Sequence, residues 1–343
     1  KQVRDYPRLK IGGAHLREPA REQAGDVAIT ALQGGIYALA LSGGLAAALA
    51  LWLARRRGIS PGAAWTMIRQ GRDEIPWRTL LATIGLLVLC VCLATVFSAK
   101  YHIFGTDKVG QDVFYLALKS IRTGLMIGTL TTLVMLPFAL LLGIMAGYFR
   151  GWVDDVIQYT YTTLSSIPGV LLIAAAVLIL QVYMDSNQEL FDTVAARADI
   201  RLLFLCVILG ITSWTGLCRL LRGETLKVRE MEFIQAATAF GVGHFRIIAR
   251  HILPNVMHIV LISIVLDFSA LVLAEAVLSY VGVGVDPSMQ SWGNMINGAR
   301  LEMAREPMVW WSLAAAFVFM FVLVLSANLF SDRVRDAFDP RVR

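Results

Sequence analysis

Two carboxylic acids, Asp267 and Glu275, interrupt an apolar stretch that covers residues 257–280. A charged side chain inside a membrane is costly and usually faces a water-filled cavity or a partner group. The two residues are eight positions apart, which is about 80° around an α-helix, so both side chains can face one pathway. There they could bind the amino group of a solute or relay protons. A hydrogen bond to a neighbouring helix is the structural alternative.

A second group of residues, made up of polar side chains and glycines, precedes the apolar stretch at 122–147. Its members are His102, Gly105, Thr106, Asp107, Gly110 and Asp112. The G-T-D segment predicts a turn in which Thr106 or Asp107 could cap the helix that follows. Further along, Trp292 lies in an S-W-G-N-M segment behind a turn rich in glycine and proline at 282–287. Its indole could contact an external partner or anchor the chain at the membrane surface.

The sequence lacks the residue patterns of common catalytic and nucleotide sites. It contains neither a G-x-x-x-x-G-K-[ST] phosphate-binding loop nor a G-x-S-x-G nucleophile motif. His244, His251 and His258 recur every seven residues, but Pro254 would interrupt a helix that presented all three. We therefore expect a chain that is not an enzyme and that binds no ATP, metal or other cofactor itself.

Residues 222–257 form a long basic segment between two apolar stretches. Small and aromatic residues recur in it at spacings of three and one, which places them on one helix face. They are Phe233, Ala236, Ala237, Phe240 and Gly241. Alanine and glycine let another backbone approach closely, and phenylalanine supplies contact area. The stripe predicts either a docking surface for a cytoplasmic partner or an amphipathic helix on the membrane surface.

Membrane-spanning helices must position these residues. The chain has 343 residues, of which 57% are hydrophobic and 16% charged, whereas soluble domains average about 45–50% apolar and about 25% charged residues. Stretches long enough to cross a bilayer lie at 28–54, 79–98, 122–147, 161–184, 201–221, 257–280 and 309–330. We expect an all-α polytopic membrane protein with about six core transmembrane helices and an extra N-terminal helix as a further alternative.

The charged loops orient the chain, and the net charge of +6 reflects this orientation rather than nucleic-acid binding. Arginines cluster at 55–78 and in the tail, which places both in the cytoplasm, whereas the acidic 185–199 loop is expected to be external. The 222–257 loop then falls on the cytoplasmic side. Residues 1–27 fit poorly, because they carry six basic residues yet would lie outside if 28–54 spans. Either an upstream span is missing, which we favour, or 28–54 does not span.

The 222–257 loop resembles the EAA loop of ABC importer permeases. The similarity runs from Glu232 to Gly241 and continues, nine residues later, in the H-I-L-P-N segment at 251–255. In that family the loop forms the coupling helix, which sits in a groove on the ATPase subunit. The resemblance thus implies ATPase coupling by Glu232, Phe233, Ala236, Ala237, Phe240, Gly241 and His244. The motif usually has leucine where Phe240 stands.

Other segments resemble the dipeptide/oligopeptide/nickel branch of these permeases. Residues 102–112 are similar to the H-x-x-G-T-D-x-x-G-R-D signature that opens its core, with Gln111 in place of the arginine. Glu275 matches a glutamate that precedes S-Y-V-G-V-G, and Trp292 matches the tryptophan of an external W-G-x-M loop. The R-D-A-F-D-P segment at 335–340 is also seen in this branch. The resemblance covers roughly residues 100–340.

This resemblance implies a type I ABC importer transmembrane domain in the bacterial inner membrane. It would translocate di- or oligopeptides by alternating access. The implied partners are a second, different permease subunit, two cytoplasmic ABC ATPases that hold ATP and Mg²⁺, a substrate-binding protein and membrane lipid, with no nucleic acid. The alternative is an ion-coupled secondary transporter that uses Asp267 and Glu275.

The expected organisation has four parts. They are an N-terminal segment at 1–78, a first core span with the external G-T-D segment at 79–121, a permease core with the coupling loop at 122–330, and a cytoplasmic tail at 331–343.

Overall fold

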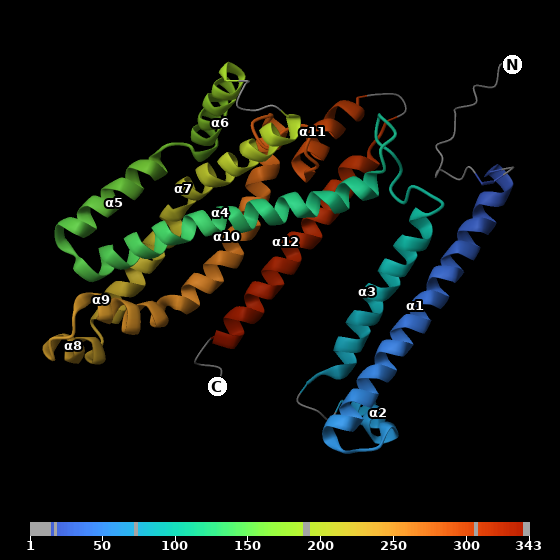
Figure 1. Ribbon diagram of the computed structural model, residues 1–343, viewed down its shortest axis with the longest axis horizontal. Helices are drawn as coiled ribbons and strands as arrows, with labels where there is room; N and C mark the ends of the chain where they lie inside the picture. The colour runs from blue at the N-terminus through green and yellow to red at the C-terminus, as the bar shows by residue number, and fades with distance from the viewer. Residues whose placement is uncertain (1–14, 17–18, 72–74, 188–192, 305–307, 339–343) are drawn as a thin grey trace. The chain divides into compact units, whose positions relative to one another are not determined.

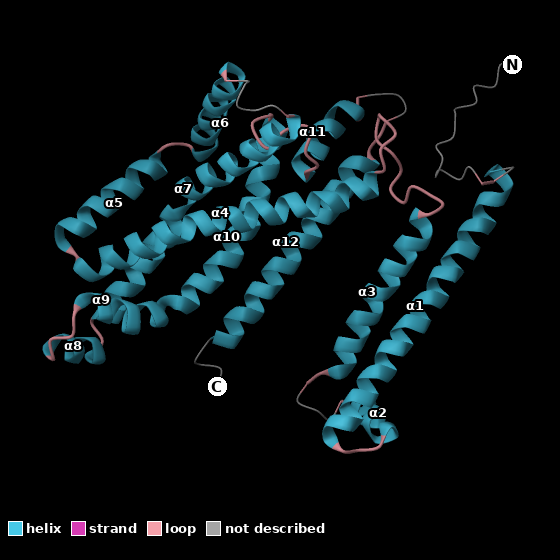
Figure 2. Cartoon of the chain, in the orientation of Figure 1, coloured by secondary structure: helices cyan, strands magenta, loops and turns pink. Residues whose placement is uncertain are grey.

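The computed structural model describes residues 15–16, 19–71, 75–187, 193–304 and 308–338. These residues are built almost entirely of helices (Figures 1 and 2). An isolated antiparallel bridge joins Thr106 to Asp112. The chain divides into two compact units, Lys1–Phe114 and Tyr115–Arg343.

The first unit is a helical hairpin. α1 (Pro19–Arg57) and α3 (Trp77–Ser98) pack along each other, and the short α2 (Pro61–Gln70) connects them at one end (Figure 1). α2 begins after Ser60, whose hydroxyl oxygen accepts a hydrogen bond from the Ala63 N–H at 3.3 Å. Apolar side chains join the three helices at this end. They are Ala50, Leu53, Ala54, Ala64, Ile68 and Trp77.

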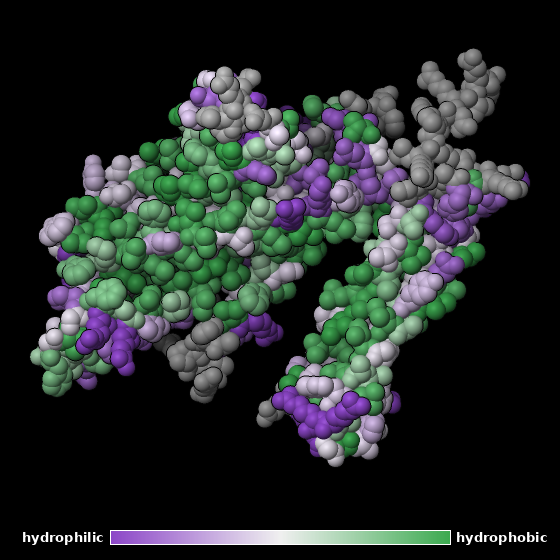
Figure 3. Space-filling model, viewed as in Figure 1, coloured by the Kyte–Doolittle hydropathy of each residue, from purple (hydrophilic) through white to green (hydrophobic). Residues whose placement is uncertain are grey.

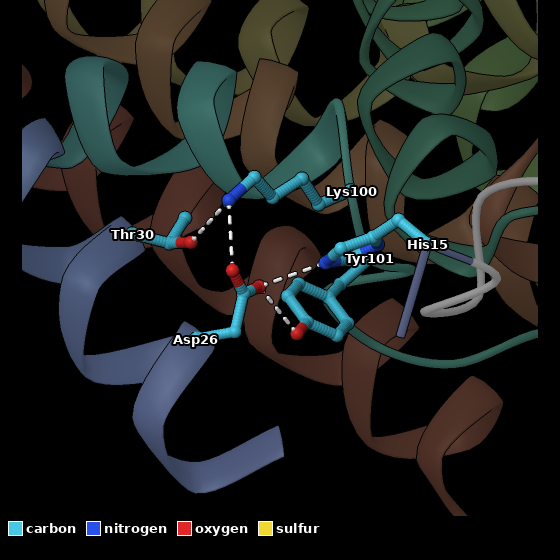
Figure 4. A network of polar contacts seen from close by, with 5 residues as sticks. All are labelled: His15, Asp26, Thr30, Lys100 and Tyr101. Atoms are coloured by element: carbon cyan, nitrogen blue, oxygen red, sulfur yellow. Dashed lines mark hydrogen bonds and ion pairs between the residues drawn. The ribbon is translucent and has the colours of Figure 1, made fainter. Parts of the chain in front are cut away.

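A polar network closes the opposite end of the hairpin (Figure 4). Asp26 of α1 accepts hydrogen bonds from Lys100 Nζ at 3.0 Å and from Tyr101 Oη at 2.6 Å. Its carboxylate also lies 3.0 Å from His15 Nε2, and Lys100 donates to the Thr30 hydroxyl at 3.1 Å. Desolvation and the hydrogen bond to Asp26 raise the pKa of Tyr101 to about 12. Because Lys100 and Tyr101 follow α3 directly, the network fixes the antiparallel register of α1 and α3.

The first unit contains the N-terminal apolar stretch 28–54. α1 contains the predicted stretch 28–54, and its Arg21–Arg57 segment is long and apolar enough to cross a membrane. α1 therefore suits a membrane span that packs beside α3. Residues 1–14 and 17–18 lie outside the described residues, and the side on which the N-terminus lies stays a prediction.

The second unit holds the remaining helices. α4 (Val113–Phe149) leads into it from the first unit. The elements that follow are α5 (Gly151–Ser166), α6 (Gly169–Ser186), α7 (Val194–Arg229), α8 (Glu232–Ala239), α9 (His244–Ile247), the π-helical turn η2 (Ile248–Ile252), α10 (Leu253–Val281), α11 (Trp292–Glu302) and α12 (Trp311–Phe338).

Six helical segments of the described chain are long and apolar enough to cross a membrane. They lie in α1, α3, α4, α6, the run from α9 to α10, and α12. The predicted stretch 201–221 forms part of α7, which is outside this set and buries many side chains within the second unit. In Figure 3 the visible face of each unit is mainly hydrophobic along the helices, with hydrophilic residues near the helix ends. The predicted all-α polytopic architecture is thus confirmed.

One predicted span differs in the structure. The stretch 161–184 is divided, because α5 ends at Ser166 and α6 begins at Gly169. Ile167 adopts an extended conformation, and Pro168 stands at the N-terminal cap of α6. Proline disfavours helical geometry in the residue before it and lacks the N–H that would continue the hydrogen-bond ladder.

α4 and α7 cross at close range. A Cβ atom added at Gly143 would lie 2.9 Å from the Cys218 carbonyl oxygen, and one at Gly147 would lie 2.7 Å from the Arg222 carbonyl oxygen. Glycine at these two positions is what allows the backbones to approach. The large apolar cluster of the second unit surrounds this crossing and continues into α5, α8 and α10.

Candidate functional site

The coupling segment forms a short helix anchored on one side. α8 begins after Met231, which has extended backbone angles, and gives way at Phe240 to a turn in which Gly241 has a φ of 73°. Ile234 is 1% exposed and packs into the large apolar cluster with Ile247. Burial of these two isoleucines therefore attaches the loop to the helical bundle.

The outer face of α8 carries most of the predicted stripe. Phe233 and Phe240 are 43% and 87% exposed, and Ala236 is exposed between them. Ala237 instead turns inward, where it is partly buried against the apolar cluster. The stripe therefore presents two phenylalanines and one alanine outward, while Gly241 makes the turn and Glu232 lies exposed in the first helical turn.

Two residues with clear structural roles were not identified from the sequence. Ile234 is the anchor of α8, and an apolar residue on the face opposite to Ala236 was the signal that could have revealed it. Phe245 is 84% exposed beyond the turn and lines an apolar pocket together with Pro137 and Phe149 of α4. Because Phe245 lies in a new helix, α9, it does not follow the residue spacing that runs from Phe233 to Gly241.

Polar contacts join the coupling loop to the ends of α4 and α7. His244 Nδ1 lies 2.8 Å from the Tyr148 hydroxyl, and the Arg229 guanidinium lies 5.8 Å from the centroid of the Tyr148 ring. Arg150, which has a φ of 57°, forms an ion pair with Glu230. A pocket of about 560 Å³ lies against α8, and Tyr148, Arg229, Glu230 and His244 are among the residues that line it.

The predicted external segment is a compact loop in the first unit. The Asp107 carboxylate accepts hydrogen bonds from the Val109 N–H at 3.0 Å and the Gln111 N–H at 2.8 Å. His102 Nδ1 lies 2.6 Å from Asp112 Oδ2. Asp107 thus caps N–H groups of the loop itself, not those of the next helix. The sharp bends fall at Gly105 and Gly110, whose φ angles are 71° and 81°, and Thr106 pairs with Asp112 across the loop.

Trp292 lies in the protein interior. It is 1% exposed, and its indole N–H donates a hydrogen bond to the Ala117 carbonyl oxygen at 3.1 Å. Its ring lies close to Gly124, where an added Cβ would be 3.2 Å away. The expectation of an anchor at the membrane surface was therefore wrong. The indole joins the start of α11 to α4, because a buried N–H needs an acceptor that the α4 backbone supplies.

The two intramembrane acids have different surroundings. Glu275 is 2% exposed, and its Oε1 accepts a hydrogen bond from the Ser279 hydroxyl at 2.7 Å. Asp267 is partly exposed at the middle of α10 and forms no hydrogen bond or ion pair with any described residue. The role of either acid in lining a pathway stays a prediction.

Comparison with known proteins identifies the family. Residues 139–343 match the family described as "Binding-protein-dependent transport system inner membrane component". The glutathione transport system permease protein GsiD of Pectobacterium atrosepticum is 32% identical over 244 residues, which are 71% of this chain and 73% of that protein. The oligopeptide transport system permease protein OppC of Mycobacterium tuberculosis is 32% identical over 242 residues, 71% of this chain and 77% of that protein.

Two further similarities were found. The dipeptide transport system permease protein DppC of Bacillus subtilis is 30% identical over 242 residues, 71% of this chain and 69% of that protein. An inward-facing structure of the MetNI methionine ABC transporter has a TM-score of 0.47 and 15% identity, and covers 65% of this chain and 96% of that one. The family and the apolar helices indicate a multi-pass protein of the bacterial inner membrane. The chain belongs to the inner membrane components of binding-protein-dependent transport systems, as an ABC importer permease of the dipeptide/oligopeptide/nickel branch.

Proposed function

We propose that this chain is one of two permease subunits of an ATP-driven importer for di- or oligopeptides. Three relatives that are 30–32% identical carry names for glutathione, oligopeptide or dipeptide transport, which supports a peptide solute. A substrate-binding protein delivers the peptide at the outer face. A second, different permease completes the pathway, and two cytoplasmic ATPases bind ATP and Mg²⁺.

The observation that carries this proposal is the outward face of α8. Phe240 is 87% exposed, and Phe233 and Ala236 lie exposed on the same short helix, which Ile234 anchors from behind. Large aromatic side chains on a firmly held helix are well suited to enter a groove on another protein. The neighbouring loops are basic, which supports a cytoplasmic position for this face.

The mechanism follows from how α8 is attached. The ATPases bind and hydrolyse ATP, and the change in their shape displaces α8. Because Ile234 and Ile247 are buried in the cluster shared by α4, α5, α7 and α10, a displacement of α8 moves these helices as well. Their tilt opens the pathway alternately to the outer and inner side. The permease itself catalyses no reaction in this scheme.

Reconstitution into proteoliposomes tests the proposal. We expect the chain to copurify with cytoplasmic ATPase subunits. Peptide uptake should require ATP on the side of the membrane where the ATPases lie and the binding protein on the opposite side. If the chain instead takes up peptide without ATPases, and a protonophore abolishes this uptake, the chain is an ion-coupled transporter.

A further inference from the structure

The coupling helix ends in a tight turn. α8 is followed by Phe240, Gly241 and Val242, and Gly243 then stands at the N-terminal cap of α9. Gly241 has a φ of 73°, and an added Cβ at Gly241 or Gly243 would meet nothing within 4 Å. The Val242 N–H donates a hydrogen bond to the Ala237 carbonyl oxygen at 3.1 Å, and Val242 is partly buried against the large apolar cluster. The turn is therefore attached to the bundle, and a further contact beyond it would add a second route from α8 to the membrane helices.

His244 provides such a contact directly after the turn. Its Nδ1 lies 2.8 Å from the Tyr148 hydroxyl, and the two rings meet edge to face with centroids 5.6 Å apart. The Phe149 ring lies 6.0 Å from the same imidazole. Tyr148 is itself 6% exposed and belongs to the large apolar cluster. The last turn of α4 thus holds His244 through one hydrogen bond and two ring contacts.

His244 connects this contact to a long helical run. His244 opens a helical run that continues through α9, η2 and α10 to Val281, and this run is long and apolar enough to span a membrane. Asp267 lies in the middle of α10. On the other side, the Arg229 guanidinium at the end of α7 lies 5.8 Å from the Tyr148 ring, a cation–π distance. Three helices therefore converge at Tyr148.

We propose that Tyr148 and His244 are positioning residues that form the joint through which movement of α8 reaches α4 and α10. This inference rests on the proposed function and assigns part of the coupling to two residues outside the exposed face of α8. The turn after α8 leads directly into this joint, which attaches the coupling loop to the bundle in addition to the buried Ile234 and Ile247.

Tyr161 of α5 offers a matched control. It is 5% exposed in the same cluster, and the Arg219 guanidinium lies 5.1 Å from its ring centroid. Its hydroxyl, however, forms no hydrogen bond with any described residue. Tyr161→Phe and Tyr148→Phe therefore remove the same atom from similar surroundings, but only Tyr148→Phe removes the bond to His244.

The test uses the complete complex in proteoliposomes and measures peptide transported per ATP hydrolysed. We expect Tyr148→Phe to lower this ratio about fivefold, the factor that one hydrogen bond typically represents, with unchanged ATPase copurification and a fall in Tm of no more than a few degrees. His244→Phe keeps a ring without the hydrogen bond and should lower the ratio similarly. The double variant should be no worse than either single variant, since both lose one shared contact. Tyr161→Phe should transport at the wild-type ratio.

Each contrary result has a distinct meaning. A wild-type ratio in Tyr148→Phe, or single effects that multiply in the double variant, would overturn the joint. A parallel loss of Tm and assembly in Tyr148→Phe would also overturn it, because the bond would then serve folding alone. Failure of the unmodified complex to take up peptide with ATP would instead reject the proposed function.

Discussion

Arg222 binds Asp154 through two parallel hydrogen bonds. Arg222 Nε lies 2.5 Å from Asp154 Oδ1, and Nη2 lies 2.6 Å from Oδ2. The two side chains are 24% and 14% exposed. This two-point geometry is the strongest arrangement available to an arginine and a carboxylate. It joins α7 to the first turn of α5, directly beside the crossing of α4 and α7.

We expect Asp154→Ala to destabilise the permease by about 1–3 kcal/mol, because it leaves a partly buried guanidinium without its partner. The measurement is the Tm of the purified protein in detergent. Asp155→Ala is the matched control, since Asp155 is exposed and pairs with no described residue. Equal changes in Tm for the two variants would show that the ion pair contributes nothing specific.

The crossing of α4 and α7 yields a second prediction. A Cβ at Gly147 would lie 2.6 Å from Thr225 Cβ and 2.7 Å from the Arg222 carbonyl oxygen. Gly147→Ala should therefore separate the helices at a cost of about 1–3 kcal/mol and lower the Tm. Gly223→Ala, where the added Cβ meets nothing within 4 Å, should leave the Tm unchanged or raise it slightly. Tolerance of alanine at Gly147 would contradict the close approach.

The coupling face yields a third prediction. Ala236 is exposed on α8, so Ala236→Asp should spare the fold. In the proposed contact with an ATPase it would place an unpaired charge, at a cost of several kcal/mol. ATPase copurification and ATP-dependent uptake should both be lost, while Ala236→Ser should retain them. Normal uptake by Ala236→Asp would remove this face from the contact.

Substitutions at Ala237 and Gly241 would be harder to interpret than Ala236→Asp. Ala237 is partly buried against the apolar cluster, so Ala237→Asp would disturb the attachment of α8 as well as docking. Gly241 has a φ of 73°, so Gly241→Asp would add backbone strain to the effect of the charge. Phe240→Ala complements Ala236→Asp, because a side chain that is 87% exposed does not support the fold. A loss of uptake in Phe240→Ala would therefore report on the proposed docking.

Local patterns were sufficient to predict most of the helices, including the short helix at Glu232–Ala239. A run of about 20 apolar residues identifies a span wherever it lies, and the spacing of Phe233, Ala236 and Phe240 defines one helix face without knowledge of neighbours. The break at Pro168 is also a local effect, because proline removes the backbone N–H that would continue the helix.

Contacts between distant residues could not be predicted in the same way. The burial of Trp292 depends on the Ala117 carbonyl oxygen, 175 residues away in the chain. The bond between Tyr148 and His244 joins residues 96 positions apart. Neither partner carries a local signal of the other, because the fold alone brings them together.

The two acids of α10 should respond differently to substitution. Glu275 is 2% exposed and accepts the Ser279 hydroxyl proton in a hydrogen bond, so Glu275→Ala should lower stability by about 1–3 kcal/mol. Asp267 has no partner among the described residues, so Asp267→Asn should preserve the Tm. If Asp267 lines the pathway, this variant should transport peptides with a free amino terminus several-fold more slowly, and the preference over amino-acetylated peptides should disappear. An unchanged preference in Asp267→Asn would place its carboxylate outside the pathway, whereas a loss of preference in a stable Glu275→Gln variant would place Glu275 within it.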